Sequence, residues 1–358
     1  MSQEKVITYI GRFQIFHKGH ESTLLHAIQN ADRVVVVVGS CNLARDPRNP
    51  FTFEERKSVI EAVLQRLAQD EWAKGRRVKF NVVGVNDYVY NNTKWLTEVQ
   101  KAVAGCTKST DIHLTGYEKD DTTYLKYFTW KKAFVPAYMG PHNGPTRDLK
   151  IVHAKDLRNT LFERNEVPTN LPEETAEFLS KFMVAKAEIF KNLCNEHAFN
   201  TEYRETMNKT LPYNTIPFLT GDALVVCSGH VLMVKRRTAP GKGLYAMPGG
   251  FFDKDKDLSQ TDTALRELKE ETKIKVPPEV LRGKIVNAME FGDPGRSLRW
   301  RIITRCVYIK LDEHELPKVK GSDDAEYAFW MPTADIVKYR DQMFEDHYSI
   351  ISVFLGLD

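Results

Sequence analysis

The sequence predicts an α/β protein with two domains, in which a parallel sheet wound with helices is followed by a smaller α+β sandwich. The chain has 358 residues, more than one hydrophobic core usually serves. Up to about residue 160, short β-branched runs alternate with amphipathic stretches, the pattern of a parallel sheet with helical crossovers. After Pro217 the pattern changes to closely spaced strands with one amphipathic helix.

The first domain is predicted to alternate strand and helix. We expect strands at residues 6–10, 34–38, 78–85 and 112–115, and helices at residues 20–31, 52–68 and 95–104. The run at 34–38 has no polar interruption, as a central strand covered on both faces should have. Ligands of such sheets bind at the carboxyl ends of the strands, so we expect the site there.

A polar, helical stretch separates the two patterns. We predict a first domain at residues 1–185, a helical connector at 186–212 and a second domain at 213–358. In the second domain we expect strands at residues 223–227 and 231–235 around a hairpin turn, a helix at 262–272, and further strands at 301–311 and 327–330.

Composition indicates an ordinary globular protein that handles small anions. Hydrophobic residues make up 42%, charged residues 28%, and the net charge is +3, so neither disorder nor a nucleic-acid-binding surface is predicted. The five cysteines are isolated, and no apolar stretch is long enough to cross a bilayer or to form a signal peptide. We expect a cytoplasmic protein with no membrane or nucleic-acid partner; the sequence leaves a homo-oligomer open.

The first motif is GRFQIFHKGH at residues 11–20, where a strand ends and a helix begins. Free backbone N–H groups and the helix dipole hold phosphates at such a junction. His17 and His20 are three residues apart and can face one phosphate cluster, where imidazole donors stabilise charge on an attacked α-phosphate. The motif resembles the GxFxPxHxGH signature of the nucleotidylyltransferase superfamily, with Ile15 where the family has Pro. Two incidental histidines are the alternative.

Further segments resemble the archaeal type of nicotinamide-mononucleotide (NMN) adenylyltransferase, a Rossmann-like nucleotidyltransferase. They are RNPFT at residues 48–52, DYVYNN at 87–92, and GYEKD at 116–120, which has Tyr where the family has His. The resemblance implies stacking of Trp95 on the nicotinamide ring; a core aromatic is the alternative. The substrate-binding residues it implies are Gly11, Arg12, Phe13, Gly19, Arg48, Asn49, Asn91, Asn92, Trp95, Gly116, Lys119 and Asp120.

A third segment, VHAKDLR at residues 152–158, resembles the superfamily's triphosphate-gripping ISxTxIR motif. Arg158 occupies the position of the phosphate-binding arginine, whereas Lys155 either holds a phosphate or is solvated. The implied reaction is attack of the NMN phosphate on the α-phosphate of ATP, which gives NAD and pyrophosphate. Positioning and charge neutralisation by Arg, Lys, His and Mg²⁺ are the expected means of catalysis.

In the second domain, PGGFF at residues 248–252 precedes RELKEE at 266–271. Glu267, Glu270 and Glu271 stand at i, i+3 and i+4, so one helical face carries three carboxylates. Because like charges this close repel, a divalent cation is the natural reason to keep them, Mg²⁺ first and Mn²⁺ as the alternative. A solvated acidic helix with an Arg266–Glu270 pair is the competing interpretation.

This segment resembles the Nudix box, GX5EX7REUXEEXGU, with three departures. The stretch between Gly250 and Arg266 is two residues longer, the first Glu has no direct counterpart, and Lys273 replaces the second Gly. Asp255 or Asp257 is expected to substitute for the missing Glu. Since the three helical carboxylates remain, we expect metal binding to remain, and the catalytic residues implied for the whole chain are His17, His20, Arg158, Glu267, Glu270 and Glu271.

The segment FEDHY at residues 344–348 resembles the C-terminal part of Nudix ADP-ribose pyrophosphatases that are fused to this adenylyltransferase type. The resemblance implies cleavage of ADP-ribose to AMP and ribose 5-phosphate by metal-activated water. Arg236, Arg296, Arg299 and Asp346 are the expected substrate contacts in this domain. Two alternatives stay open: a Nudix domain that senses its ligand without hydrolysis, and a first domain that uses a different phosphate acceptor.

Overall fold

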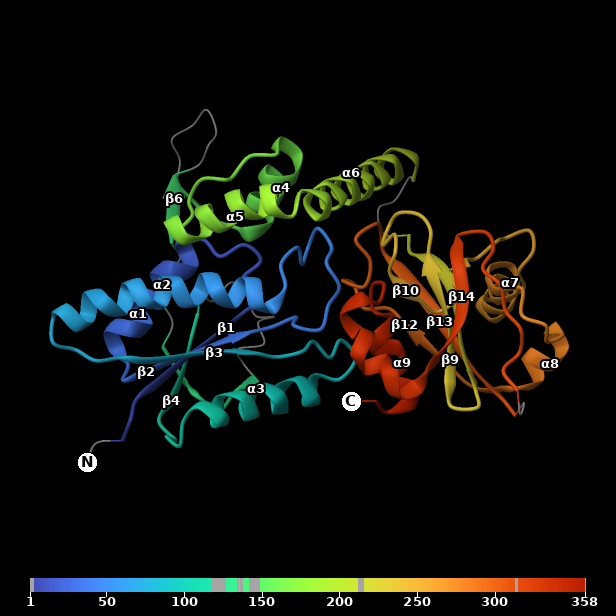
Figure 1. Ribbon diagram of the computed structural model, residues 1–358, viewed down its shortest axis with the longest axis horizontal. Coiled ribbons are helices and arrows are strands. Elements are labelled where there is room, and N and C mark those ends of the chain that lie inside the picture. The colour runs from blue at the N-terminus through green and yellow to red at the C-terminus, as the bar shows by residue number, and fades with distance from the viewer. Residues whose placement is uncertain are drawn as a thin grey trace. The chain divides into compact units, whose positions relative to one another are not determined.

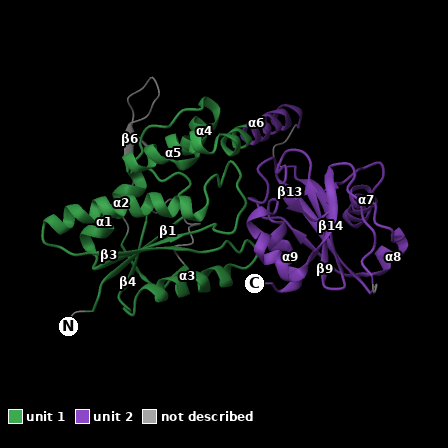
Figure 2. Cartoon of the chain, in the orientation of Figure 1, with its two compact units in different colours: residues 1–194 green, residues 195–358 purple. Residues whose placement is uncertain are grey.

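The computed structural model describes residues 3–116, 127–133, 135, 138–141, 149–211, 216–312 and 315–357. The chain divides into two compact units, Met1–Cys194 and Asn195–Asp358, shown in separate colours in Figure 2. Predicted connector residues 186–212 fall largely on one helix, α6 (Ala187–Thr210), through which the division between the units passes.

The first unit is built on a parallel sheet whose strand order is β3-β2-β1-β4-β5. Strand β1 is central and pairs with β2 in the register Val6 to Arg33 and with β4 in the register Val6 to Ile112. The strands and their crossover helices are β1 (Val6–Gly11), α1 (Lys18–Asn30), β2 (Arg33–Val38), α2 (Phe53–Ala73), β3 (Lys79–Gly84), α3 (Asn92–Cys106), β4 (Ile112–Thr115) and β5 (Lys131–Lys132).

Helices α1 and α2 lie on one side of this sheet and α3 lies on the other (Figure 1), and alternating side chains of the strands pack against the two sides. Ile7 and Tyr9 join the core formed with α1 and α2, whereas Val6 and Ile10 join the core formed with α3. In β2 every residue from Val34 to Val38 is fully buried, because helices cover both of its faces. This confirms the predicted Rossmann-like arrangement.

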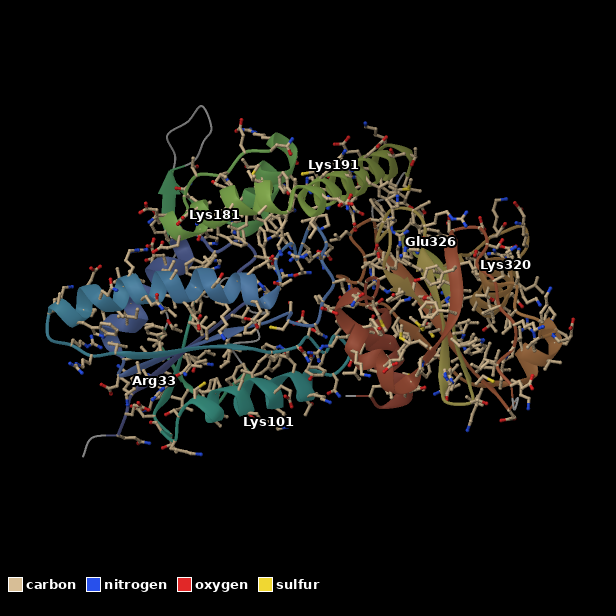
Figure 3. The ribbon with its side chains drawn as sticks, in the orientation of Figure 1. Arg33, Lys101, Lys181, Lys191, Lys320 and Glu326 are labelled. Carbon is tan, nitrogen blue, oxygen red and sulfur yellow. The ribbon has the colours of Figure 1, made fainter. Side chains whose placement is uncertain are left out.

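Charged side chains lie on the outer sides of the helices (Figure 3). Lys101 of α3 and Lys181 of α5 (Glu173–Ala185) are both largely exposed and each pairs with a Glu on its own helix. Such pairs at i, i+3 or i+4 stabilise a helix by only a few tenths of a kcal/mol, roughly 0.2–0.5 each, so burial of the apolar faces dominates the stability.

Helices at the end of the first unit pack against its N-terminal loop. Ile15 of that loop is fully buried among apolar side chains of α4 and α5, together with Phe51. This packing holds α4 beside the loop that carries His17. The elements of this part are β6 (Met139–Pro141), β7 (Leu149–Ile151), α4 (Ala154–Arg164), α5 (Glu173–Ala185) and α6.

The second unit is a mixed sheet with the order β10-β9-β8-β13-β12, to which β11 adds on β8 and β14 on β9. The β8–β13 pair is parallel and the others are antiparallel. This confirms the predicted α+β class of the domain. Its elements are β8 (Phe218–Cys227), β9 (His230–Arg236), β10 (Tyr245–Ala246), β11 (Gly249–Phe251), α7 (Gln260–Thr272), α8 (Pro278–Gly283), β12 (Ile285–Phe291), β13 (Ile302–Leu311), β14 (Ala325–Pro332), the 3-10 helix η2 (Thr333–Gln342) and α9 (His347–Leu355).

Helix α7 lies unusually close to strand β8. A Cβ on Gly221 would collide with the carbonyl oxygen of Gln260 and with the backbone nitrogen of Ala264. Gln260 also donates from Nε2 to the carbonyl oxygen of Thr220 (2.8 Å), which joins the first turn of the helix to the strand. The glycine thereby sets the distance of α7 from the sheet.

Throughout the described residues, no helix combines the length and apolar character needed to cross a bilayer.

Candidate active sites of the two units

In the first unit, the loop after β1 ends in a helix cap made by two imidazoles. His17 precedes α1, and its Nδ1 accepts a hydrogen bond from the N–H of Gly19 (3.1 Å). In return, the N–H of His17 donates to Nδ1 of His20 (3.2 Å). The two rings stack with centroids 3.7 Å apart. The arrangement has the reciprocal logic of a capping box, with histidines in the place of the usual Ser/Thr and Glu.

The cap decides which nitrogen of each ring is a donor. Because each Nδ1 accepts a backbone N–H, the proton of the neutral ring is on Nε2. Gly19 gives His17 room, since a Cβ there would stand 3.0 Å from the imidazole Cε1. Phe13 packs edge-on against His20 with centroids 5.1 Å apart and, like His17, is buried. Both rings therefore present Nε2 donors in fixed orientations at the start of α1.

Arg56 of α2 binds the backbone of the loop that follows β1. Its Nη1 donates to the carbonyl oxygens of Arg12 and Gly39, each at 2.7 Å, and its Nη2 donates to that of Ser40 (3.1 Å). Its Nε donates to the carbonyl oxygen of Thr52. One buried guanidinium thus joins the carboxyl ends of β1 and β2 to the start of α2. Arg56 was not among the site residues expected from the sequence.

Three cations come together beside this loop. Nη1 of Arg158, on α4, donates to the carbonyl oxygen of Gln14. Burial first, and then the charges of Arg12 and Arg48, lower the pKa of Arg158 to about 10, against the opposing effect of Asp46. The structure therefore brings Arg12, Arg48 and Arg158 from three separate segments into one electropositive place.

The residues predicted to bind the pyridine nucleotide lie around α3. Asn91 caps this helix, since its Oδ1 accepts from the N–H of Lys94 (3.0 Å), and Asn92 is the exposed first residue of the helix. Trp95 packs edge-on against Phe128, with centroids 6.0 Å apart, and keeps part of its surface exposed. The packing is compatible with both interpretations of Trp95.

Other predicted residues of this site are placed as follows. Asn49 is buried, and its Oδ1 has no hydrogen-bond partner among the described residues. Gly11 passes close to the ring of Phe13, which leaves no room for a Cβ. Gly116 lies directly after β4 and is the last residue of the described range 3–116. Lys119 and Asp120 lie outside the described residues.

The second unit contains a cavity of about 560 Å³ that is lined by groups of both charges. The carboxylates include those of Asp222, Glu267 and Glu271, and the guanidinium groups include those of Arg236 and Arg299. A cavity of this size suits a nucleotide-sized ligand, and the presence of both kinds of group suits one with phosphates and a cation.

Among the carboxylates of the cavity, Glu267 and Glu271 of α7 face the glycine turn. The N–H of Gly249 donates to Oε2 of Glu271 (3.1 Å), and a Cβ on Gly250 would collide with the carboxylate of Glu267. Burial first and the charge of Glu267 second raise the pKa of Glu271 to about 8, against the opposing effect of the Gly249 hydrogen bond. Burial likewise raises the pKa of Glu267, against the opposing effect of Arg266.

These observations test whether the residues fit a divalent cation. Glu271 is buried, the Glu267 side chain is 15% exposed, and the charge of Glu267 raises the pKa of Glu271. A cation bound by both carboxylates would relieve this repulsion, so Glu267 and Glu271 fit. Within the described residues, no three acidic, His or Cys side chains are already gathered at ligating distance. Glu270 lies apart, with a side chain 41% exposed, and it accepts a hydrogen bond from Arg266 (3.0 Å).

Arg266 ties the extended loop to α7. Its Nε and Nη2 donate to the two carboxylate oxygens of Asp257, each at 2.9 Å, and Nη2 also donates to the carbonyl oxygen of Phe251 (3.0 Å). Asp257 is buried, whereas Asp255 is exposed and pairs with Lys254. Of the two carboxylates proposed to replace the missing Glu, Asp257 is therefore the one bound to the arginine of the box.

Two arginine side chains of the cavity pack against aromatic rings. The guanidinium of Arg236 lies 4.1 Å from the ring centre of Phe344, and that of Arg299 lies 5.8 Å from the same ring. Arg299 also reaches Phe251 at 5.5 Å, and its Nη2 donates to Glu345 (3.4 Å). Burial lowers the pKa of Arg236, and the charge of Arg299 adds to this effect.

Arg296 has a different environment from the other two arginines. Its Nε and Nη2 donate to the two carboxylate oxygens of Asp346, each at 3.0 Å, and both side chains are 3% exposed. Arg296 borders the cavity, whereas Asp346 stands behind it as the arginine's partner. Substrate contact thus stays a prediction for Asp346, while the structure shows it fixing Arg296.

Asp222 also belongs to this site, although it was not among the residues expected from the sequence. Its side chain is buried on β8, where Thr304 donates to its Oδ2 (2.5 Å), and it lines the cavity. The available signal was a single carboxylate directly before the apolar run ALVVC, because a buried charge in a strand needs a specific partner.

The two units correspond to two nucleotide-handling families, in chain order. A cytidylyltransferase-like family model matches residues 8–109, and a NUDIX domain model matches residues 218–354. The nicotinamide/nicotinic acid mononucleotide adenylyltransferase of Acinetobacter baylyi is 30% identical over 190 residues, which cover 52% of this chain and 90% of that protein. Fold and site thus define a nucleotidyltransferase joined to a Nudix domain.

Solved structures extend this similarity over both units. A bifunctional NMN adenylyltransferase/ADP ribose pyrophosphatase from Francisella tularensis is 31% identical, has a TM-score of 0.86, and the match covers 99% of each chain. A second structure, of the enzyme from the same organism complexed with AMP and a manganese ion, is 30% identical, with a TM-score of 0.84 and the same coverage. The chain belongs to the family of bifunctional NMN adenylyltransferases/ADP-ribose pyrophosphatases.

The Arg266–Asp257 pair generates a prediction about stability. The hydrogen bonds from Arg266 lower the pKa of Asp257 from 3.8 to about 2, which corresponds to about 2 kcal/mol in favour of the folded second unit. Because this folded-state pKa is depressed, the contribution is present above pH 4 and is lost as the pH falls from about 4 to about 2. Asp257→Asn should lower the melting temperature of the second unit by roughly 5 °C at neutral pH.

Differential scanning calorimetry between pH 2 and pH 7 measures this effect. Asp255→Asn is the matched control, since the Asp255 side chain is 75% exposed, and it should leave the transition unchanged. An equal effect of the two substitutions would show that the pair with Arg266 does not stabilise the loop.

Proposed function

We propose that this chain catalyses two reactions, adenylyl transfer from ATP to NMN in the first unit and hydrolysis of ADP-ribose in the second. The observation that carries the proposal is the pair of built sites, each in the unit whose family performs the corresponding chemistry. ATP, NMN, NAD and ADP-ribose are thus the proposed small-molecule partners.

For the first reaction, an oxygen of the NMN phosphate attacks the α-phosphorus of ATP, and the bond to the pyrophosphate leaving group breaks. The Nε2 donors of His17 and His20 hold the oxygens of the attacked phosphate. Arg12, Arg48 and Arg158 offset the charge of the triphosphate, and no side chain forms a covalent bond. We assign Mg²⁺ to this site as the counter-ion of the triphosphate.

Nicotinamide binding rests on the helix that follows β3. Trp95 offers the exposed part of its ring for stacking, and Phe128 supports the ring edge-on. Asn91 fixes the start of the helix through its cap, so its contribution to the acceptor site is through position.

For the second reaction, Glu267 and Glu271 are the residues that would hold Mg²⁺ or Mn²⁺, and Glu270, which accepts a hydrogen bond from Arg266, stays a predicted third ligand. When bound, the cation supplies charge neutralisation for the diphosphate and water of lowered pKa. Arg236 and Arg299, which line the same cavity, bind and orient the diphosphate. Water adds to one phosphorus, the bridging P–O bond breaks, and AMP and ribose 5-phosphate leave.

His17 and His20 can be tested without loss of the helix cap. An Asn side chain places Oδ1 where the imidazole has Nδ1, so His17→Asn keeps an acceptor for the N–H of Gly19 and removes the Nε2 donor. We expect NAD synthesis to fall about 100- to 1,000-fold with an unchanged melting temperature. His26→Ala, on the same helix, is the control and should retain activity. Near-wild-type turnover of a folded His17→Asn variant would overturn the assignment.

Trp95→Ala distinguishes stacking from core packing. Loss of stacking raises the KM for NMN and leaves the KM for ATP nearly unchanged, because only acceptor binding changes. Steady-state kinetics with each substrate varied in turn measures both constants. Trp72→Ala, at an exposed tryptophan of the same unit, should change neither. A drop in melting temperature without a specific effect on NMN would identify Trp95 as a core residue.

Glu271→Gln keeps the shape of the side chain and removes the charge that a cation requires. Release of AMP from ADP-ribose should fall by orders of magnitude, with Glu267→Gln behaving alike, while NAD synthesis by the same preparation stays near wild type because the two sites lie in separate units. Glu279→Gln, at an exposed position, is the control. Wild-type protein that binds ADP-ribose but releases no AMP with Mg²⁺ or Mn²⁺ would replace hydrolysis by ligand sensing.

A further inference from the structure

His347 is a buried residue of the Nudix cavity to which neither the motif nor the reaction above gives a role. It is the first residue of α9, borders the cavity and is 5% exposed. Its Nδ1 accepts a hydrogen bond from the N–H of Met247 (2.9 Å), which also borders the cavity. Nε2 therefore carries the proton of the neutral ring. Within the described residues, Nε2 makes no hydrogen bond.

The ring is neutral although acidic groups surround it. Burial lowers the pKa of His347, while Asp222, Asp346 and Glu345 raise it and Arg296 lowers it. Burial is the largest of these effects, so the imidazole does not become a cation at neutral pH. A neutral imidazole with an engaged Nδ1 can donate one hydrogen bond, and it cannot accept a proton at Nε2.

His347 lies beside both kinds of group that line the cavity. Asp222 is one of the lining carboxylates, and its charge acts on the imidazole. Phe344, which packs against Arg236, lies edge-on to the imidazole, with centroids 5.6 Å apart. Guanidinium groups bind phosphate oxygens directly, and a cation held by the carboxylates would bind them too, so both draw a diphosphate toward the part of the cavity that His347 borders.

We propose that His347 is a catalytic residue of the hydrolase site, whose Nε2–H donates to a non-bridging oxygen of the substrate diphosphate. The inference rests on the proposed function, since it takes a diphosphate as the occupant of the cavity. Negative charge builds up on the phosphate oxygens as water adds and the bridging P–O bond breaks. A fixed donor stabilises this charge, and no proton is transferred to or from the imidazole.

Two variants distinguish this proposal from a purely structural role, in which His347 serves only as the acceptor for the N–H of Met247. His347→Asn keeps an acceptor at the place of Nδ1 and has no donor at the place of Nε2. His347→Gln places an amide nitrogen where Nε2 was and loses the acceptor for Met247. Under our proposal the Gln variant retains more hydrolase activity than the Asn variant, whereas under the structural role the Asn variant retains more.

The experiment compares the wild type with both variants as full-length protein. For His347→Asn we expect kcat for AMP release from ADP-ribose with Mg²⁺ to fall about a hundredfold, with an unchanged melting temperature and unchanged NAD synthesis. For His347→Gln we expect partial rescue of kcat, even where its melting temperature is lower. An Asn variant with wild-type kcat, or a Gln variant less active than the Asn variant, overturns the proposal.

A binding measurement separates this inference from the proposed function. Isothermal titration with ADP-ribose in EDTA should show about tenfold weaker binding to His347→Asn than to the wild type, since one hydrogen bond to a charged group is lost. If the wild type binds ADP-ribose without hydrolysing it, hydrolysis fails and the tenfold difference still supports the contact. If the wild type neither binds nor hydrolyses it, the proposed function and this inference are both overturned.

Discussion

One arginine in each unit, the buried Arg56 and the largely buried Arg266, must have its N–H groups satisfied, and the loops that carry the sites are arranged around this requirement. A guanidinium has five donors and cannot be deprotonated, so leaving any of them unpaired in the interior is costly. Arg56 satisfies its donors with the carbonyl oxygens of Arg12, Gly39, Ser40 and Thr52. These hydrogen bonds fix the backbone of the loops that follow β1 and β2.

Arg266 acts in the same manner on the extended loop of the Nudix box. It contacts Asp257, Phe251 and two glutamates of α7, so the longer loop is attached to the helix that carries the carboxylates. The additional residues between Gly250 and Arg266 bulge outward through Asp255, which is exposed. Insertion therefore changes the length of the loop without separating Glu267 from the glycine turn.

Most of the fold followed from the periodicity of the sequence. The elements that were missed have no periodic signal, and the structure shows the reason for each. Strands β1 to β4 and helix α7 were predicted within a few residues, whereas the short strands β5, β6 and β7 were not predicted. Strand β12 was missed because it is an edge strand whose side chains are mostly exposed, so apolar and polar residues do not alternate. Helix α9 was missed because its first six residues are all buried, which leaves it without a polar face.

The motifs of both sites were visible in the sequence, whereas pairings through space were not. Spacing could place Glu267 and Glu271 on one face, and it could not choose between Asp255 and Asp257 because burial decides that choice. Arg296 and Asp346 look like ligand contacts in a list of charged residues, yet they are 50 positions apart and bind each other. A sequence shows which groups are available, and tertiary packing decides which of them remain for a substrate.

The central place of β1 has a consequence for how the chain acquires its structure during synthesis. This strand is the first to be made, but its two neighbours, β2 and β4, end at Val38 and Thr115. One edge of β1 therefore stays without its partner until more than a hundred residues have been translated, and the loop with His17 is suspended from a strand that is paired on one side only. Aggregation of the nascent chain is most favoured in that interval, because the unpaired edge belongs to a strand that is apolar on both faces.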